Sequence, residues 1–407
     1  MALIENKDKL LIERQKLNAL LEITNAVNKN YKVSELIVQF ENVMQNYIGI
    51  KKLAFVNKRD SWKCILNYGM KNHCNDLKIK ELLKIDGTLI INKNENHVFD
   101  QFDIILPVFH KENALSYLLL GGIEEDEMMQ FIETHLGFVQ TLANVVSVAI
   151  ETKNLAKELI KKKLEEKDMK IAAEMQKLLL PANLPSNHLI DIAGTYIAKN
   201  MVSGDYYDFI RINKNEYIFC IADVSGKGTS AAMLMSNFQA TLRANVKYNH
   251  ANLTLKELVS ELNTSVINAA KGEKFITFFI GYYNESNRKL KYVNAGHNFP
   301  ILLHKGEIKE LQTGCTPLGV FEELPSLESK VLTIEPNTII VCYTDGMVEV
   351  ENELKEQFES ERLAKGILAN SCLNMSEMNK ALFREVNKFK GENDYPDDTA
   401  LLSLRII

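Results

Sequence analysis

The sequence predicts an α+β protein of three consecutive parts. Groups of strand-like runs are interspersed with helical segments, and a highly charged stretch separates two such groups. The composition supports folded domains, because 46% hydrophobic and 25% charged residues are usual for globular chains. At roughly 150 residues per domain, the 407 residues leave room for two or three domains. We expect a first domain at 1–150, a helical linker at 151–184 and a second domain at 185–407.

The first domain has a mixed α and β pattern. Leucines at positions such as Leu10, Leu17 and Leu21 recur at helical spacing, and Ser34 is a candidate cap for a second helix. Strand-like runs follow at 52–56, 62–67, 104–109 and 114–121, and a helix is predicted at 126–150. Leading helices, a group of strands and a closing helix predict a compact domain.

The linker is predicted to be one continuous helix. Twelve of the twenty residues 151–170 are charged, helix formers dominate, and no glycine or proline occurs before Pro181. Leu155, Leu159 and Leu164 form an apolar stripe, which predicts a parallel coiled coil and hence a homodimer. Charged residues interrupt the seam, so a single solvated helix is the alternative.

The last part is rich in strands. Strand-like runs occur at 190–198, 217–224, 276–283, 289–293, 301–303, 331–334, 339–343 and 401–407. Helices are expected at about 229–248, 255–271, 353–369 and 376–390. Because the helices come in pairs between groups of strands, this part is α+β and not an alternating βαβ fold.

Charge and cysteine content exclude several classes of protein. The net charge of −5 gives no basic face for nucleic acid, and no window approaches the ~20 apolar residues of a membrane helix. The N-terminus is charged and lacks the apolar core of a signal peptide. The six cysteines are scattered without a CxxC pair, so no zinc site is predicted. We expect a cytoplasmic protein with reduced cysteines and without membrane insertion.

Carboxylates occur where predicted strands begin or end. Asp205, Asp223 and Asp345 each lie at such a place, and Asp397 and Asp398 precede the final strand. Aspartate and glycine are ordinary turn residues, so each position alone favours a turn. Together the acids would repel one another unless a cation neutralised them, and oxygen-only ligands favour Mg²⁺, Mn²⁺ or Ca²⁺.

Nine ordered stretches carry a family resemblance. They are AAEMQKLLLP (172–181), SGDYYDF (203–209), ADVSGKGTSAAMLM (222–235), TFFIGYY (277–283), YVNAGHNFPIL (292–302), PLGVF (317–321), YTDGMVE (343–349), QFESERL (357–363) and DDTALLSLR (397–405). The set resembles the PPM family of metal-dependent protein phosphatases, in its bacterial RsbU/SpoIIE branch. The resemblance implies a β-sandwich of two antiparallel sheets flanked by helices, with the acids in a cleft at one end.

The resemblance also implies roles for individual residues. Asp223 is similar to the carboxylate that bridges two Mn²⁺ or Mg²⁺ ions, and the Val224 carbonyl to a further ligand. Asp345 and Asp397 match the remaining carboxylate ligands, and Asp205 matches an acid near the same centre. Two such ions would activate a water for attack on a phosphoserine or phosphothreonine.

Other positions near these motifs are further candidates for the site. The branch lacks the histidine that many eukaryotic relatives carry beside the bridging acid, and Lys227 lies near that place. His297 is a candidate acid, but an organiser of its own loop is the favoured interpretation. Asp398 is a possible further ligand, and Gly226 permits a tight turn with Gly228. Ser203 replaces a usual glycine, and the last motif reads DDTA instead of DDxT.

The preceding residues suggest regulation. DIILPVFHKENALSYLLLGG (103–122) and its flanking helices resemble a GAF-type sensor domain, and 172–180 matches a helix regarded as a switch in this branch. An unknown ligand or protein signal would act on the first domain. The resemblance implies a phosphorylated STAS-type protein as the substrate. A metal-free pseudophosphatase that only binds is one alternative, and a GGDEF-type nucleotide cyclase is another, although Tyr206 stands where that motif needs an acid.

Overall fold

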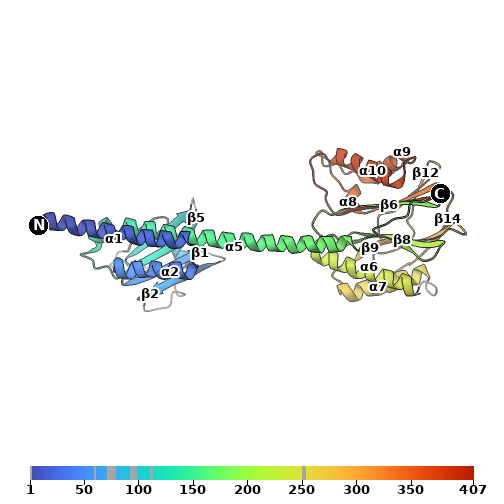
Figure 1. Cartoon of the computed structure of the whole chain (residues 1–407). Helices are drawn as coiled ribbons and strands as arrows, with labels where there is room; N and C mark the ends of the chain where they lie inside the picture. Colours follow the sequence, from blue (N-terminus) through green and yellow to red (C-terminus); the bar gives the residue numbers. More distant parts are fainter. Residues whose placement is uncertain (1, 59–60, 71–78, 92–98, 111–112, 250–253) are drawn as a thin grey trace. The chain divides into compact units, whose positions relative to one another are not determined.

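The structure is a computed structural model that describes residues 2–58, 61–70, 79–91, 99–110, 113–249 and 254–407 (Figure 1). The chain divides into two compact units, Met1–Leu164 and Glu165–Ile407. Both combine helices with antiparallel sheets, so the predicted α+β class is confirmed.

The N-terminal unit is one five-stranded antiparallel sheet with helices. The strand order is β2-β1-β5-β4-β3. Its elements are α1 (Ala2–Asn28), α2 (Val33–Asn42), a π-helical turn (Val43–Tyr47), β1 (Lys52–Lys58), β2 (Trp62–Tyr68), α3 (Ile79–Leu82), β3 (Leu89–Ile90), β4 (Ile104–His110), β5 (Asn113–Gly121) and α4 (Met128–Phe131). The four strands expected from alternation are present.

Two apolar clusters bury the faces of this sheet. Phe55, Leu106 and Leu118 pack with residues of α1, α2 and the long helix α5 (Gly137–Lys177). Ala54 and Leu119, one position away on the same strands, face the opposite way with α3. The expected single helix at 126–150 is interrupted, because a π-helical turn at Ile132–Leu136 separates α4 from α5. Cys64 is disulfide-bonded, so the expectation of reduced cysteines is wrong for this residue.

Helix α5 confirms the predicted continuous helix as far as Lys177, but it ends before Leu180, where the predicted switch segment ends. It runs without a break from Gly137 to Lys177 and so contains the charged stretch 151–170. The apolar side chains predicted to form the stripe are exposed, with Leu155, Leu159 and Leu164 at 56%, 54% and 61%. Within the described ranges, every helix is either too short or too polar to cross a lipid bilayer.

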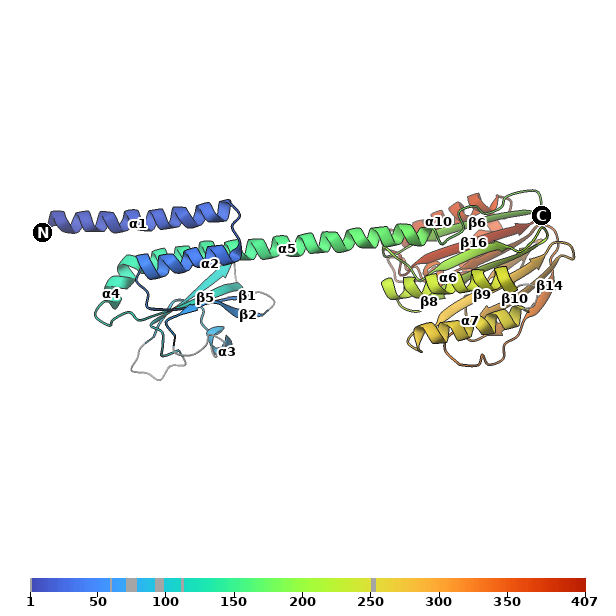
Figure 2. The ribbon, with the colours of Figure 1, turned by 60° about the horizontal axis from the view of Figure 1, so that its bottom comes forward.

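The C-terminal unit consists of two sheets with helices outside them (Figure 2). One sheet has the order β13-β10-β9-β8-β7, with β14 also paired to β10, and the other has the order β12-β11-β15-β16-β6. The strands are β6 (Ile190–Ile197), β7 (Tyr206–Arg211), β8 (Glu216–Val224), β9 (Ile276–Asn284), β10 (Lys289–Ala295), β11 (Ile301–His304), β12 (Glu307–Glu310), β13 (Gly314–Cys315), β14 (Lys330–Thr333), β15 (Thr338–Tyr343) and β16 (Thr399–Ile406). All pairs are antiparallel except the two-residue pair of β10 with β13.

Alternation along the strands builds three apolar layers. In β8, Tyr217, Phe219 and Ile221 belong to the core between the sheets. Ile218 and Cys220 point the other way, toward α6 (Thr229–Asn249) and α7 (Leu255–Ala270). The other sheet packs its outer face on α9 (Glu359–Ala369) and α10 (Met375–Lys390). Figure 1 shows these two helix pairs on opposite sides of the stacked sheets.

One predicted helix begins later than expected. The sequence predicted a helix over 353–369, whereas α9 begins at Glu359. Residues 351–357 form a turn closed by a β-bridge between Glu351 and Gln357. The buried Phe358 is the last residue before α9, and its backbone N–H donates to Val350 O at 2.9 Å, which also closes this turn.

Candidate functional site

The predicted acids lie at one set of strand ends in the C-terminal unit. Asp205 directly precedes β7, and Asp223 is the second-last residue of β8. Asp345 follows β15 as the first residue of the short helix α8 (Asp345–Val348), and Asp397 precedes β16. Both sheets of the sandwich therefore contribute acids to this end.

Asp205 is held in place by two hydroxyl groups. Its backbone N–H donates to Ser203 Oγ at 3.0 Å, and Thr344 Oγ1 donates to Asp205 Oδ2 at 2.7 Å. The side chain is almost fully buried, at 1% exposure. Burial, and then the charge of Asp223, raise the pKa of Asp205 well above its ordinary value, although the Thr344 hydrogen bond opposes this.

Asp223 is a half-buried acid with several other acids near it. Burial raises its pKa to about 7, and the charges of Asp345, Asp397 and Asp398 add to the increase. Its neighbour across the sheet is Thr277 of β9. A carboxylate held this way is destabilised at neutral pH unless positive charge is near it.

Asp345 is brought close to the other acids by the glycine that follows it. A Cβ on Gly346 would meet Asp398 O at 1.9 Å and Thr399 Oγ1 at 2.8 Å. Only a residue without a side chain allows α8 to approach the start of β16 so closely. Burial, followed by the charges of Glu349 and Asp397, raises the pKa of Asp345.

Asp397 forms an ion pair with Lys227. The Lys227 Nζ lies 2.7 Å from Asp397 Oδ2, and Nζ also donates to Pro396 O at 3.1 Å. The loop that carries Lys227 has two glycines with positive φ, Gly226 at 85° and Gly228 at 76°. The hydrogen bond with Asp397 raises the pKa of Lys227.

Asp398 has a different role from Asp397 in this structure. Its Oδ1 accepts the backbone N–H of Lys199 at 2.8 Å, and its Oδ2 accepts that of Gly204 at 3.2 Å. Both oxygens therefore fix the loop that leads to Asp205. Gly204 in turn packs tightly on Val224, since a Cβ there would lie 2.9 Å from the Val224 carbonyl oxygen.

His297 is buried and neutral. Its Nδ1 is 2.8 Å from Thr277 Oγ1, and its backbone N–H donates to Asn294 Oδ1 at 2.7 Å. Burial lowers the pKa of His297 to about 4, so the ring holds no extra proton at pH 7 to give to a leaving group. These contacts favour the interpretation that His297 organises its loop.

Two residues that sequence reasoning did not select also support the site. Thr344, inside the YTDG motif, donates to Asp205 and accepts the Ala400 N–H at 2.8 Å. Gln176, near the end of α5, is buried and bonds Ser203 twice: Nε2 donates to Ser203 O at 2.7 Å, and Oε1 accepts from Ser203 N at 3.0 Å. The position of Thr344 beside Asp345 was an available signal, whereas nothing local marks Gln176.

The residues fit a divalent cation by their chemistry. The donors are carboxylate oxygens, which hard cations prefer, and their mutual repulsion is partly offset by the Lys227 ammonium. In the described part of the chain, however, no three His, Cys, Asp or Glu side chains already form a group that could hold an ion.

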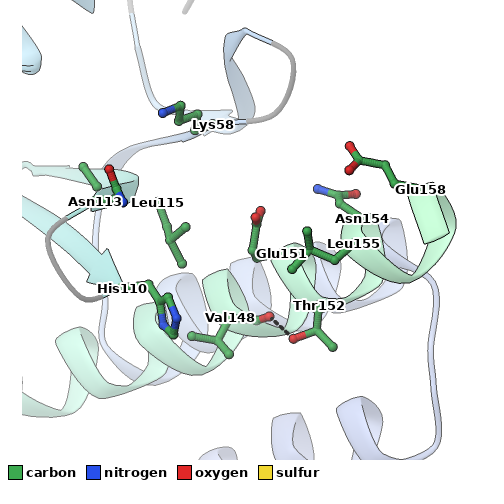
Figure 3. A pocket seen from close by; sticks show the side chains of 11 residues that line it. Lys58, His110, Asn113, Leu115, Val148, Glu151, Thr152, Asn154, Leu155 and Glu158 are labelled. Atoms are coloured by element: carbon green, nitrogen blue, oxygen red, sulfur yellow. Dashed lines mark hydrogen bonds between the residues drawn. The ribbon is translucent and has the colours of Figure 1, made fainter. Parts of the chain in front are cut away.

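The N-terminal unit has a separate cavity of about 490 Å³ (Figure 3). It lies between the ends of β4 and β5 and helix α5, with Lys58 and His110 among the basic lining residues and Glu151 and Glu158 among the acidic ones. The aromatic residues Trp62, Tyr68 and Phe109 of the same unit do not line it. Trp62 instead packs against Tyr117, at 5.5 Å between ring centroids.

Comparisons with known proteins assign a class to the C-terminal unit. The profile of the family described as Stage II sporulation protein E (SpoIIE) matches residues 213–407. The SiaA-PP2C domain of Pseudomonas aeruginosa has the same fold, with a TM-score of 0.55 over 61% of this chain and 99% of that one at 17% identity. The C-terminal unit therefore matches the SpoIIE family model over most of its length and has the fold of a PP2C domain.

Two curated proteins are similar in sequence to this chain. The chain is 27% identical over 240 residues to phosphoserine phosphatase RsbU of Bacillus subtilis, over 58% of this chain and 70% of RsbU. It is 28% identical over 244 residues to protein IcfG of a Synechocystis strain, over 54% of this chain but only 38% of IcfG. The C-terminal unit thus has RsbU among its relatives. Less similar PP2C-type structures, with TM-scores of 0.42 and 0.39, are a complex of RsbX with magnesium and one of PstP with two manganese ions.

Proposed function

We propose that the chain is a metal-dependent phosphoserine/phosphothreonine protein phosphatase. The observation that carries the proposal is the group of buried or half-buried acids at one end of the sandwich, whose charges raise one another's pKa. A divalent cation would neutralise such a group at neutral pH, and RsbU, one of the relatives, is by its printed name a phosphoserine phosphatase.

Each acid has a proposed place around two Mn²⁺ or Mg²⁺ ions. Asp223 would bridge them, Asp345 and Asp397 would supply further carboxylate oxygens, and the Val224 carbonyl and Asp205 would complete the set. When bound, the two ions would activate a water for in-line attack on phosphorus and neutralise phosphoryl oxygens.

The protein around these acids holds them for this task. Thr344 orients Asp205, and Asp398 holds the preceding loop through Lys199 and Gly204. Because both supports use buried hydrogen bonds, they keep the acids aligned while the carboxylates close around a cation. Because burial lowers the pKa of His297 to about 4, this histidine is a poor proton donor to the leaving group at neutral pH.

The proposed substrate is a phosphorylated protein, and by analogy with the RsbU branch a STAS-type anti-anti-sigma protein in bacterial signalling. RsbU is by its printed name a phosphoserine phosphatase, which supports phosphoserine as the group removed. The test is turnover of a phosphoserine peptide and of a phosphorylated STAS protein by the full chain, with and without Mn²⁺. Metal-dependent release of phosphate is expected.

Two other functions would give different results in the same assays. A pseudophosphatase would bind the phosphoprotein without releasing phosphate at any Mn²⁺ concentration. A GGDEF-type cyclase would convert GTP, but Tyr206 occupies the position that needs an acid and its side chain is fully buried, donating to Asp208. The arrangement of the acids therefore favours the phosphatase.

We further propose that residues 1–150 form a GAF-like sensor that acts through the linker 151–184 on the domain at 185–407. The supporting facts are the unbroken helix α5 and the two hydrogen bonds of Gln176, within the predicted switch segment 172–180, to the loop before Asp205. The exposed stripe of Leu155, Leu159 and Leu164 supports a parallel homodimer through this helix.

An insertion tests this regulatory proposal. Two extra residues after Lys163 rotate the following helix by about 200°. A coupled protein should change its rate of phosphate release or lose its response to the signal. If the insertion and a deletion of residues 1–150 both leave the rate unchanged, the N-terminal domain only tethers the phosphatase.

A further inference from the structure

Lys227 is a lysine that lies beside the predicted metal ligands. It sits in the turn between β8 and α6, four residues after Asp223, and the positive-φ glycines on either side turn the loop sharply. Its Nζ reaches Asp397 Oδ2 at 2.7 Å and Pro396 O at 3.1 Å. One ammonium therefore spans from the segment after β8 to the segment before β16, where two of the acids lie.

The ion pair between Lys227 and Asp397 can break, so that Lys227 can pair with another anion. The Lys227 side chain is 49% exposed and that of Asp397 is 33% exposed. Ion pairs with this much water access contribute little to stability, so the ammonium can leave at small cost. Its four-carbon stem and freely rotating donors allow it to reach another anion nearby.

We propose that Lys227 is an exchangeable counter-ion for the site. In the metal-free protein its ammonium neutralises Asp397, and when divalent cations take that carboxylate it turns to a phosphoryl oxygen of the substrate. This inference rests on the proposed phosphatase function. A substrate phosphomonoester carries about two negative charges at neutral pH, so a released ammonium at the rim of the site would bind it favourably.

The proposal predicts two effects of opposite sign. An ammonium that competes for Asp397 weakens metal binding, so its removal should tighten metal binding. The same ammonium binds the phosphoryl group, so its removal should weaken substrate binding. A residue that only kept the loop folded would give a different result. Its loss would loosen Asp397 and so weaken metal binding and substrate binding alike.

The experiment uses the full chain and the variants Lys227→Gln and Lys227→Arg. Mn²⁺ alone is titrated by calorimetry, and KM is measured with a phosphoserine peptide at saturating Mn²⁺. Lys227→Gln should bind Mn²⁺ about three- to tenfold more tightly, the range expected for losing one like charge near the ion at high effective dielectric. Its KM should rise about tenfold, the usual size of a lost charge-assisted hydrogen bond. Lys227→Arg should restore most of both values.

Lys199→Gln is the matched control. Among the described residues, the Lys199 ammonium donates to Pro396 O and forms no ion pair with a carboxylate, and the substitution keeps the backbone N–H that bonds Asp398. Its Mn²⁺ affinity and KM should stay within about twofold of wild type. Equal effects of Lys199→Gln and Lys227→Gln would show that only general surface charge matters and would overturn the proposal.

Failure of this inference can be told from failure of the proposed function. If the wild-type chain neither binds Mn²⁺ nor releases phosphate, the function itself is wrong. If wild type does both, while Lys227→Gln leaves Mn²⁺ affinity unchanged or weakens it, the phosphatase stands and the role of Lys227 as a counter-ion is refuted.

Discussion

Gly346 gives the sharpest test of how the acids are brought together. Replacing it by alanine puts a methyl group 1.9 Å from Asp398 O and 2.9 Å from Asp398 C, and backbone atoms there cannot rotate away as a side chain would. Helix α8 must therefore separate from the start of β16. Overpacking of this kind costs about 1–3 kcal/mol, and a shift of about 1 Å between Asp345 and Asp397 can cost about 10²-fold in turnover.

The assay combines phosphate release with hydrogen exchange. The free energy of opening that hydrogen exchange measures for the amides of β15 and β16 should fall in Gly346→Ala by the free energy that the overpacking costs. Both strands should show it, since they pair along their length. Gly366→Ala in α9 is the control within the same unit. There the new methyl meets the Glu385 Oε2 and Leu382 Cδ2 atoms, which are the ends of flexible side chains. Normal turnover in Gly346→Ala would refute the argument that this glycine sets the position of Asp345.

Three further predictions concern other parts of the account. Gln176→Ala removes both hydrogen bonds to Ser203 and should lower turnover at least tenfold while leaving the exchange of β1 and β5 amides unchanged; equal turnover would contradict a supporting role. The pKa of Asp223 is raised from 3.8 to about 7, so the folded chain binds more protons than the unfolded one in that interval, and its metal-free stability should fall as pH rises from about 4 to 7. Urea unfolding in EDTA should show a smaller fall in Asp223→Asn, and a rise in stability over this interval would oppose the reasoning. Replacing Leu155, Leu159 and Leu164 together by glutamate should convert a dimer to a monomer in light scattering, and a wild-type monomer at tens of micromolar would reject the dimer.

The sequence predicted the strands well because their signal is local. In β8 the alternating apolar residues face two different cores, and the prediction of 217–224 differs from the observed start by one residue. β7 was not predicted, because the buried Asp208 interrupts its apolar pattern. The structure shows that Arg243 of α6 pairs with that carboxylate at 2.7 Å, a partner 35 residues away that no local pattern reveals.

The sequence predicted which acids form the site, but not the hydrogen bonds that hold them in place. Motifs around Asp205, Asp223, Asp345 and Asp397 placed acids at strand ends, and the structure puts them at one end of the sandwich. The task of Asp398 could not be inferred, because its partners Lys199 and Gly204 are almost 200 residues earlier. The contact of Gln176 with Ser203 likewise depends on how α5 packs within its unit, which helical periodicity does not specify.

The central claim is that these acids bind divalent cations and thereby release phosphate. The most direct measurement is phosphate release from a phosphoserine peptide by the full chain across a Mn²⁺ titration, with wild type, Asp223→Asn and Asp345→Asn side by side. We expect saturable Mn²⁺ dependence in wild type and at least ~10²-fold lower turnover in each variant. Both variants should remain folded, because removing one of several repelling carboxylates relieves strain without the metal. Near-normal turnover of Asp223→Asn at saturating Mn²⁺, or wild-type turnover that persists in EDTA, would contradict the account.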